Sequence, residues 1–380
     1  GFPTCPGSLL KHYGVAMAFD FRFASVADID ALVALEQDCF TLDRLSPRNF
    51  NWMVRRANAC LIVAEQQGHL AGYALLLFHR GTSLARLYSI AVSPAWRGHG
   101  LGQQLLDQAQ ASALERNCAW LRLEVRADNP AAISLYESNG YQRFAVVENY
   151  YEDHSQALRF EKRILRSAPP PARQVPYYAQ TTEFTCGAAC LLMAMAAVER
   201  ERAMHRSEEI QLWREATTIF MTAGHGGCSP QGLALAAWRR GFEVCMVVSQ
   251  PGSLFLDGVR SAQKKDVMQL VEDGFAGALA ETDVHQVLAP GLDVRSALQA
   301  GFRPVVLISS YRFTRLKAPH WILVTGCDDE FVYLHDPDVD HSRQKRILDC
   351  QHLPVSHAEF QRMSSFGRQR VRAAVLLRGR

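Results

Sequence analysis

Two groups of residues in this chain of 380 have the types and spacing that chemistry requires. The first is a glycine-rich turn, RGHGLG at residues 97–102, between a predicted strand and a predicted helix. The second combines Cys186, at the predicted start of an apolar helix, with His320 and Asp336 further along the chain. The first group indicates binding of an anion, and the second indicates a nucleophilic thiol.

The RGHGLG turn is suited to a phosphate group. Its glycines let the backbone turn tightly and approach a ligand closely. The free N–H groups in the first turn of the following helix then point at an anion, with the helix dipole in support. A pyrophosphate would fit this turn, although a plain tight connection explains the glycines about as well. A dinucleotide site is disfavoured, because no βαβ unit with an acidic ribose ligand is visible.

Cys186 is predicted at a helix N-terminus, where partial positive charge stabilises the thiolate that attacks carbonyls. Gln180, six residues upstream, is close enough to donate its amide to a developing oxyanion. His320 and Asp336 flank a predicted hairpin centred near Asp328, and a symmetric register places them opposite each other. The carboxylate would then fix the imidazole for the thiol. Without these partners, Cys186 would more often be a buried structural thiol.

Hydrophobic periodicity predicts the elements that hold both groups. Residues 27–40 have helical spacing, and residues 60–65 and 71–78 are predicted strands around a Gln-Gly turn. A strand over residues 84–92 and a helix over 102–116 enclose the RGHGLG turn. Residues 120–126 alternate strictly, and Asn129-Pro130 predicts a helix start.

Three consecutive prolines at residues 169–171 indicate an extended spacer that joins neither a helix nor a central strand. We therefore expect a first domain over residues 18–166, a linker over 167–174 and a second domain over 175–380. Residues 1–17 are expected to form a poorly structured extension.

Composition favours a globular protein, since 48% of the residues are hydrophobic and 21% are charged. A net charge of +3 gives no reason to expect nucleic acid or an anionic membrane as a partner. No apolar run approaches the ~18 residues of a membrane span. The ten cysteines contain no pair of CxxC elements, so we expect no metal site, and buried free thiols fit a reducing cytoplasm.

Residues 90–102, IAVSPAWRGHGLG, resemble the acetyl-CoA signature of the GNAT acetyltransferases. Residues 123–136, LEVRADNPAAISLY, with NGY at 139–141 and ENYY at 148–151, resemble the branch that acetylates the N-terminal alanine of ribosomal proteins. The resemblance covers residues 18–165. It implies a GNAT fold of the α/β class, in which helices flank a mixed central sheet.

The same resemblance implies acetyl-CoA as cofactor and an amine as acceptor, on a peptide or protein N-terminus or on a small molecule. Glu124 would be the general base and Tyr136 the general acid. The residues implied in cofactor binding are Ile90, Ala91, Val92, Arg97, Gly98, His99, Gly100, Leu101, Gly102 and Asn129. Two alternatives stay open from the sequence, because Glu124 could be a solvated strand carboxylate and Tyr136 a core aromatic.

The second half resembles the papain-like peptidases that trim double-glycine leaders from bacteriocin precursors. The matching pieces are QTTEFTCGAAC at residues 180–190, His320 at a strand start and HDP at residues 335–337, within a match from residue 175 to at least 347. The resemblance implies an α+β papain-like fold, with Cys186 as nucleophile, His320 as base, Asp336 as its orienter and Gln180 as oxyanion donor. Those peptidases usually precede transporter segments, and none follows here, so the leader substrate stays open.

The sequence thus predicts a bifunctional enzyme, an N-acetyltransferase joined to a cysteine peptidase or amidase. The alternative is an acetyltransferase of small amines whose papain-like domain binds peptides without cleaving them.

Overall fold

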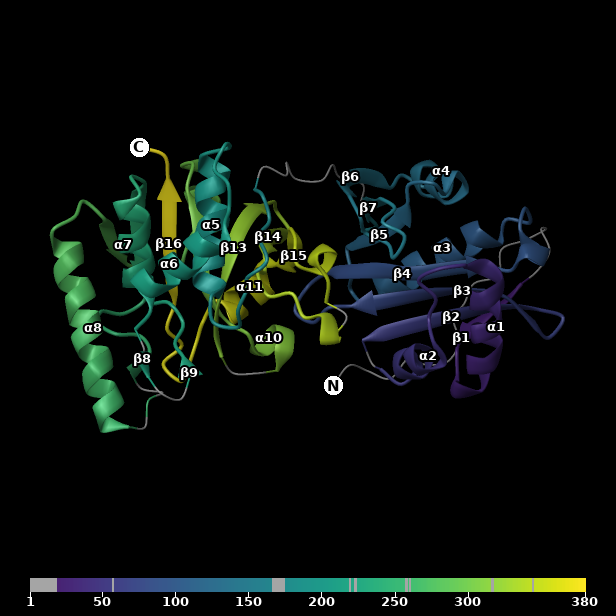
Figure 1. Ribbon diagram of the computed structural model, residues 1–380, viewed down its shortest axis with the longest axis horizontal. Coiled ribbons are helices and arrows are strands. Elements are labelled where there is room, and N and C mark those ends of the chain that lie inside the picture. Colours follow the sequence, from purple (N-terminus) through teal and green to yellow (C-terminus); the bar gives the residue numbers. More distant parts are fainter. Residues whose placement is uncertain are drawn as a thin grey trace. The chain divides into compact units, whose positions relative to one another are not determined.

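The computed structural model describes residues 19–56, 58–165, 175–218, 220–221, 224–256, 259, 261–315, 318–343 and 345–380. Its internal contacts divide the chain into two compact units with a boundary between residues 170 and 171 (Figure 1). The extension expected over residues 1–17 and the linker expected over 167–174 lie outside the described residues.

The first unit is a seven-stranded mixed sheet in the order β1-β2-β3-β4-β5-β7-β6, with helices on both faces. Among the described strands of this sheet, β4 and β5 pair in parallel and the other neighbours pair antiparallel. The strands are β1 Asp20–Phe23, β2 Ala59–Gln66, β3 His69–Phe78, β4 Leu84–Val92, β5 Trp120–Arg126, β6 Gln142–Val147 and β7 Ala157–Arg163. The helices are α1 Ile29–Cys39, α2 Pro47–Val54, α3 Leu101–Glu115 and α4 Pro130–Ser138, with short 3-10 turns η1 Val26–Asp28 and η2 Pro94–Trp96.

A β-bulge separates the ends of the two parallel strands. On the β3 side, Ser89 pairs with Leu75 and Leu87 pairs with Leu76, which leaves Tyr88 as the extra residue of β4. On the other side, the register between β4 and β5 ends at Leu87. Because a bulge bends its strand and increases its twist, β4 diverges from β5 over its last residues. A gap therefore opens between neighbouring strands just before the turn into α3.

The second unit is an α+β domain around another seven-stranded sheet, in the order β11-β10-β16-β12-β13-β14-β15. Its strands are β10 Glu243–Val248, β11 His285–Leu288, β12 Arg303–Ser309, β13 Pro319–Cys327, β14 Phe331–His335, β15 Leu353–Ser356 and β16 Ala373–Arg378, beside a small pair of β8 Phe220–Met221 and β9 Gly224–His225. The helices are α5 Cys186–Val198, α6 Arg206–Ala216, α7 Pro230–Arg239, α8 Ala262–Ala280, α9 Val294–Gln299, α10 Tyr311–Thr314 and α11 His357–Met363, with 3-10 turns η4 His341–Arg343 and η5 Ile347–Asp349.

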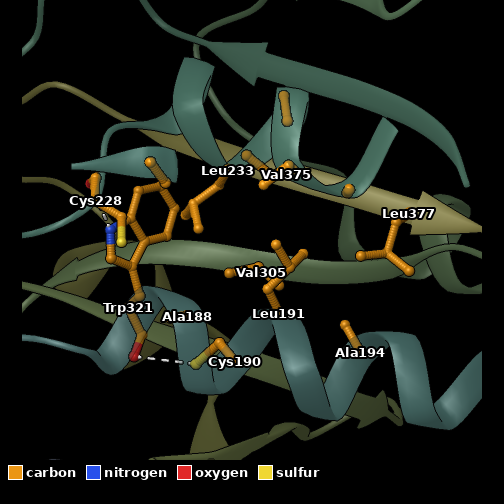
Figure 2. Close-up of a cluster of buried hydrophobic side chains, with 14 of the residues drawn as sticks. Ala188, Cys190, Leu191, Ala194, Cys228, Leu233, Val305, Trp321, Val375 and Leu377 are labelled. Carbon is orange, nitrogen blue, oxygen red and sulfur yellow. Dashed lines mark hydrogen bonds between the residues drawn. The ribbon is translucent and has the colours of Figure 1, made fainter. Parts of the chain in front are cut away.

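Helix α5 is the centre of the second core. Its residues 186–196 are all buried, as expected for a helix that is apolar on every side. In Figure 2, Leu191 and its neighbours on α5 face Val305 and Leu377 of the sheet, and Leu233 of α7 packs alongside. This packing fixes both ends of α5, so a side chain on its first turn is held by the whole core.

Within the part of the chain that the structure describes, no helix combines the length and the apolar character needed to cross a membrane.

Candidate active sites

The turn from β4 into α3 presents backbone amides to open space. Gly98 and Gly100 have positive φ angles of 79° and 76°, which residues with a side chain rarely adopt. A β-carbon at either glycine would meet nothing within 4 Å. Gly100 is the N-cap of α3, and no described side chain caps the helix there. The first amides of α3 are therefore available to an anion, and the macrodipole favours one.

The other residues expected to bind the cofactor surround this turn. Ile90, Ala91 and Val92 lie on the part of β4 beyond its last registered pair with β5. The Arg97 Nε donates to the Val92 carbonyl at 3.4 Å, and the His99 ring is 3.0 Å from the Arg97 carbonyl through Nδ1. Asn129 makes its side-chain hydrogen bond at another helix. Its side-chain oxygen accepts from the Ala132 amide at 3.1 Å and caps α4.

Glu124 is a half-buried carboxylate with a hydrogen-bond donor on each oxygen, rather than a solvated one. Its side chain is 9% exposed, and it accepts a hydrogen bond from Arg159 Nε at 2.8 Å on one oxygen. The Tyr150 hydroxyl donates to the other oxygen. Glu124 and Arg159 are direct partners in the register between β5 and β7, which explains the ion pair. The sequence interpretation did not identify either partner as a site residue, although Tyr150 lies in the ENYY segment.

Tyr136 projects from the second turn of α4 into the core. It is 4% exposed and packs edge-on against Tyr141, with ring centroids 5.8 Å apart. Burial raises the pKa of the Tyr136 hydroxyl above its usual value, so the phenol keeps its proton at neutral pH. The residue is thus a core aromatic by its contacts, with a hydroxyl that can act only as a proton donor.

In the second unit, Cys186 is the first residue of α5, as expected, and His320 lies near the start of β13. The His320 Nε2 donates to Asp336 Oδ1 at 2.7 Å, and the Cys186 side chain faces the ring closely enough to affect its protonation. Burial opposes the charge on His320, but attraction to Asp336, the bond to Asp336 and the effect of Cys186 outweigh it. The pKa of His320 is raised from 6.5 to about 10. Thiol, imidazole and carboxylate therefore converge at the N-terminus of α5.

The expected register of the hairpin is wrong by two residues next to the site. His335 pairs with Leu323, so Asp336 is not directly opposite His320. The Asp328 carboxylate accepts from the amides of Glu330 and Phe331, so this residue opens the turn instead of standing at its centre. A bulge between Val324 and Gly326 shifts the register once more. Asp336 still reaches His320, because diagonal neighbours share one face of the sheet.

Gln180 is tied to the segment that follows β14. Its backbone N–H donates to the Pro337 carbonyl at 2.9 Å, and its side-chain Nε2 donates to Asp338 Oδ1 at 3.4 Å. Its buried Oε1 has no hydrogen-bond partner among the described residues. The oxyanion role expected for Gln180 remains a prediction, with its side chain held by a carboxylate next to the triad.

Lys345 is a site residue of the second unit that the sequence did not predict. Its Nζ donates to Asp336 Oδ2 at 2.6 Å, on the oxygen that His320 does not use. A lone lysine nine residues beyond Asp336 carries no motif or periodicity, so no signal in the sequence points to it. Burial removes water from Asp336 and would by itself raise the pKa of its carboxyl. The positive charges of Lys345 and His320 outweigh this effect, so the pKa of Asp336 lies well below its usual range.

Two other thiols lie near the nucleophile. Cys190, one turn further along α5, donates to the Trp321 carbonyl at 3.4 Å, and Trp321 Nε1 donates to the Cys228 carbonyl (Figure 2). Burial raises the pKa of both thiols, so they stay protonated. Among the described residues, no group of three His, Cys, Asp or Glu side chains is placed to hold a metal ion.

Each unit matches the model of a known protein family. The model of the Peptidase_C39 like family matches residues 175–378, and that of the Acetyltransferase (GNAT) family matches residues 29–141. A Bacillus subtilis protein assigned as a ribosomal protein bS18 alanine N-acetyltransferase is 32% identical over 135 residues, which cover 36% of this chain and 88% of that protein.

Two solved structures are also similar to the first unit. The ribosomal-protein-S18-alanine N-acetyltransferase of Escherichia coli is 28% identical, covers 40% of this chain and 99% of its own, and has a TM-score of 0.37. A protein of Salmonella typhimurium assigned as an acetyltransferase, solved with its cofactor acetyl-CoA, is 23% identical over 40% of this chain and 98% of its own, with a TM-score of 0.35.

Proposed function

Because the chain belongs to the Peptidase_C39 like family and its first domain to the GNAT acetyltransferases, we propose that it is a bifunctional peptide-modifying enzyme. The first domain transfers an acetyl group from acetyl-CoA to an amine on a peptide or protein N-terminus. The second domain cleaves a peptide or amide bond with Cys186. The observation that carries the second activity is the bond between His320 Nε2 and Asp336 Oδ1, at 2.7 Å beside Cys186.

The cysteine site has the groups for acyl transfer to water. Asp336 holds the imidazole through Nε2, so the second ring nitrogen of His320 takes the thiol proton. The thiolate attacks the carbonyl carbon, and the amide of Gln180 donates to the oxyanion that forms. His320 returns the proton to the departing amine, which leaves a thioester on Cys186. Water then hydrolyses the thioester, releasing a carboxylic acid and restoring the thiol.

The first domain has room and donors for acetyl-CoA. The uncapped amides of α3 and the open space over Gly98 and Gly100 suit its pyrophosphate, and the gap between β4 and β5 suits an extended chain. Acetyl-CoA supplies the activated acetyl group as a thioester. Glu124 accepts the proton that the acceptor ammonium must lose before it can attack, and Tyr136 donates a proton to the departing thiolate.

A relative supports the proposed acceptor class. The similar protein of B. subtilis is assigned as a ribosomal protein bS18 alanine N-acetyltransferase. We extend this only to the chemical class, an α-amine on a peptide or protein.

The proposal is tested by incubating the full chain with acetyl-CoA and a peptide library, then mapping new acetyl groups and new termini by mass spectrometry. The wild type is expected to produce both. Cys186→Ser should abolish the new termini and keep acetylation, and Glu124→Gln should slow acetylation strongly and keep the new termini.

Two outcomes would contradict the proposal. New termini produced equally by Cys186→Ser would remove the cysteine mechanism. Binding of peptides without cleavage, together with acetylation of small amines but not of peptides, would favour an acetyltransferase of small molecules with a non-catalytic peptide-binding domain.

A further inference from the structure

Lys345 lies behind the cysteine site, where its ammonium group meets two carboxylates. Its Nζ is 2.6 Å from Asp336 Oδ2 and 3.9 Å from Asp338 Oδ2. The Lys345 side chain is 14% exposed and that of Asp336 is 2% exposed. A lysine at this depth has lost most of its hydration, so its position has to be explained by the carboxylates that it meets.

The chain folds back on itself to bring Lys345 to this place. Asp340 and Lys345 exchange two backbone hydrogen bonds, of 3.1 and 2.9 Å, which close the loop after β14. Asp336 is held at the base of this loop, because its amide donates to the Cys350 carbonyl and its carbonyl accepts from the Tyr177 hydroxyl. The ion pair thus joins two backbone segments that are each fixed independently of it.

The two oxygens of Asp336 have separate partners. Oδ1 accepts from His320 Nε2 at 2.7 Å and from the Asp338 amide at 3.0 Å. Oδ2 accepts from Lys345. His320 is a cation for only part of a catalytic cycle, since it takes a proton from the thiol and later gives it to the leaving group. Lys345 is therefore the cation that stays beside Asp336 when the imidazole is neutral.

Another buried carboxyl of this domain has no cation as a partner among the described residues. Glu272 on α8 is 5% exposed, and its Oε2 has no hydrogen-bond partner among the described residues. Burial raises its pKa to about 7. The pKa of Asp336 is instead lowered, despite greater burial, because Lys345 and His320 face it. A protonated Asp336 could no longer serve as a plain acceptor for Nε2–H, and the imidazole tautomer would be lost.

We propose that Lys345 is a positioning residue of the cysteine site, which keeps Asp336 ionised and fixed while His320 is neutral and so sets how readily His320 gives up its proton. This inference rests on the proposed peptidase or amidase function. It also gives the site a second carboxylate, because Lys345 lies near Asp338, whose Oδ1 accepts from Gln180 Nε2. Lys345 thereby faces two carboxylates, one bonded to the base His320 and the other to Gln180, the expected oxyanion donor.

Several titratable groups face Lys345 and His320 and affect their protonation. Asp336, Asp338 and Cys350 face Lys345, and Asp336 and Cys186 face His320. Asp336 also acts on Tyr177, Cys190 and Cys350, and Asp349 acts on Cys350. Lys345 is the one lysine in this set. Replacing it by a neutral residue removes a positive charge, and every remaining group there then binds protons more tightly.

The test uses the full chain and needs no substrate. Alkylation of Cys186 by iodoacetamide is followed by mass spectrometry from about pH 4 to pH 11, and the His320 ring is titrated by NMR over the same range. In the wild type we expect two transitions, for formation of the thiolate–imidazolium pair and for loss of the imidazolium proton. Lys345→Met should move the second transition upward by on the order of 1 pH unit.

The controls separate charge from shape. Lys345→Arg keeps the charge and should restore the wild-type transition, and Lys265→Met, at an exposed position on α8, should not move it. Once a cleaved peptide is known, Lys345→Met should lower kcat about 10-fold with little change in KM, since an imidazolium held too tightly is a poor acid. If Lys345→Met does not fold, Lys345→Gln carries the same comparison.

The outcomes distinguish this inference from the function on which it rests. A wild-type Cys186 that alkylates with one transition near pH 8.5, like a free thiol, would overturn the cysteine mechanism itself. Two transitions in the wild type, with the second unchanged in Lys345→Met, would overturn the role of Lys345 and leave the mechanism standing.

Discussion

Each domain contains a carboxylate that is shielded from solvent and bonded to a cation, but only one of the two is proposed to react itself. In the cysteine domain, Asp336 meets Lys345 and His320, and only His320 touches the nucleophile. In the acetyltransferase domain, Glu124 meets Arg159 and Tyr150 and is itself the proposed base. In the cysteine domain the ion pair therefore holds Asp336, which is proposed to orient the base. In the acetyltransferase domain it engages Glu124, which is itself the proposed base.

The difference concerns how ready each site is. A carboxylate that only orients an imidazole gains from a permanent cation, because the cation keeps it ionised and in place. A carboxylate that must accept a proton loses lone pairs to every donor that already holds it. The cysteine site is thus assembled before substrate arrives, whereas Glu124 has to exchange a donor for the acceptor amine or act through a water molecule.

The largest effect is expected for Asp336→Asn. The asparagine amide can present its NH2 group to His320, which places the ring proton on the nitrogen that should face Cys186. We expect kcat for peptide cleavage to fall by about 10³- to 10⁴-fold, with acetyl transfer unchanged. Both rates are measured on one preparation, so the acetyltransferase domain serves as the internal control. A loss below about 10-fold would mean that Asp336 does not orient the imidazole.

Glu124→Gln probes the other carboxylate. Removing a general base should slow acetyl transfer by about 10²-fold or more, while binding of acetyl-CoA, measured by calorimetry, stays the same. Tyr150→Phe removes one donor from Glu124 and should have a smaller effect, and Glu115→Gln at the exposed end of α3 should have none. Unchanged turnover in Glu124→Gln would reject this residue as the base.

Local patterns in the sequence were sufficient for the elements of both sites. The strands expected over residues 84–92 and 120–126 are β4 and β5, because strict alternation and flanking turn residues define them locally. The helix start at Asn129-Pro130 and the start of α5 at Cys186 follow from capping chemistry and apolar spacing. The resemblance to two families supplied the roles of these residues, which spacing alone does not give.

Partners that arrive from elsewhere in the chain were not predictable in this way. Arg159 faces Glu124 only because β7 inserts beside β5, and Lys345 reaches Asp336 only because a loop closes behind β14. The hairpin register failed for a related reason, since the Asp328 side chain opens the turn and a bulge follows. His320 and Asp336 still meet despite this error, because both side chains stay on the same face of the sheet.

Glu272 offers the third comparison, because it is a buried carboxyl with no cation partner among the described residues. Its pKa is raised by burial from 4.5 to about 7, so its effect on stability is absent below about pH 4.5 and grows as a cost while pH rises towards 7. Glu272→Gln should therefore stabilise the second domain at pH 8 by up to about 3 kcal/mol and change little at pH 4.5. Calorimetry measures this on the transition that acetyl-CoA does not shift. Equal stabilisation at both pH values would show that ionisation is not the cause.

The smallest effects on stability are expected at two glycines, Gly187 and Gly102, which are the second residues of α5 and α3. A β-carbon on Gly187 would lie 3.0 Å from both Cys228 Cβ and Trp321 Cδ1, whereas one on Gly102 would meet Leu135 and Val92 at 3.6 and 3.9 Å. Gly187→Ala should destabilise the second domain by about 2 kcal/mol, since overpacking shifts neighbours that the core holds in place. Gly102→Ala should leave the stability of the first domain within about 0.5 kcal/mol, so any loss of acetyl-CoA affinity would come from the ligand's approach to the backbone. Calorimetric unfolding with and without acetyl-CoA resolves both effects, and equal destabilisation by the two variants would contradict the difference in packing.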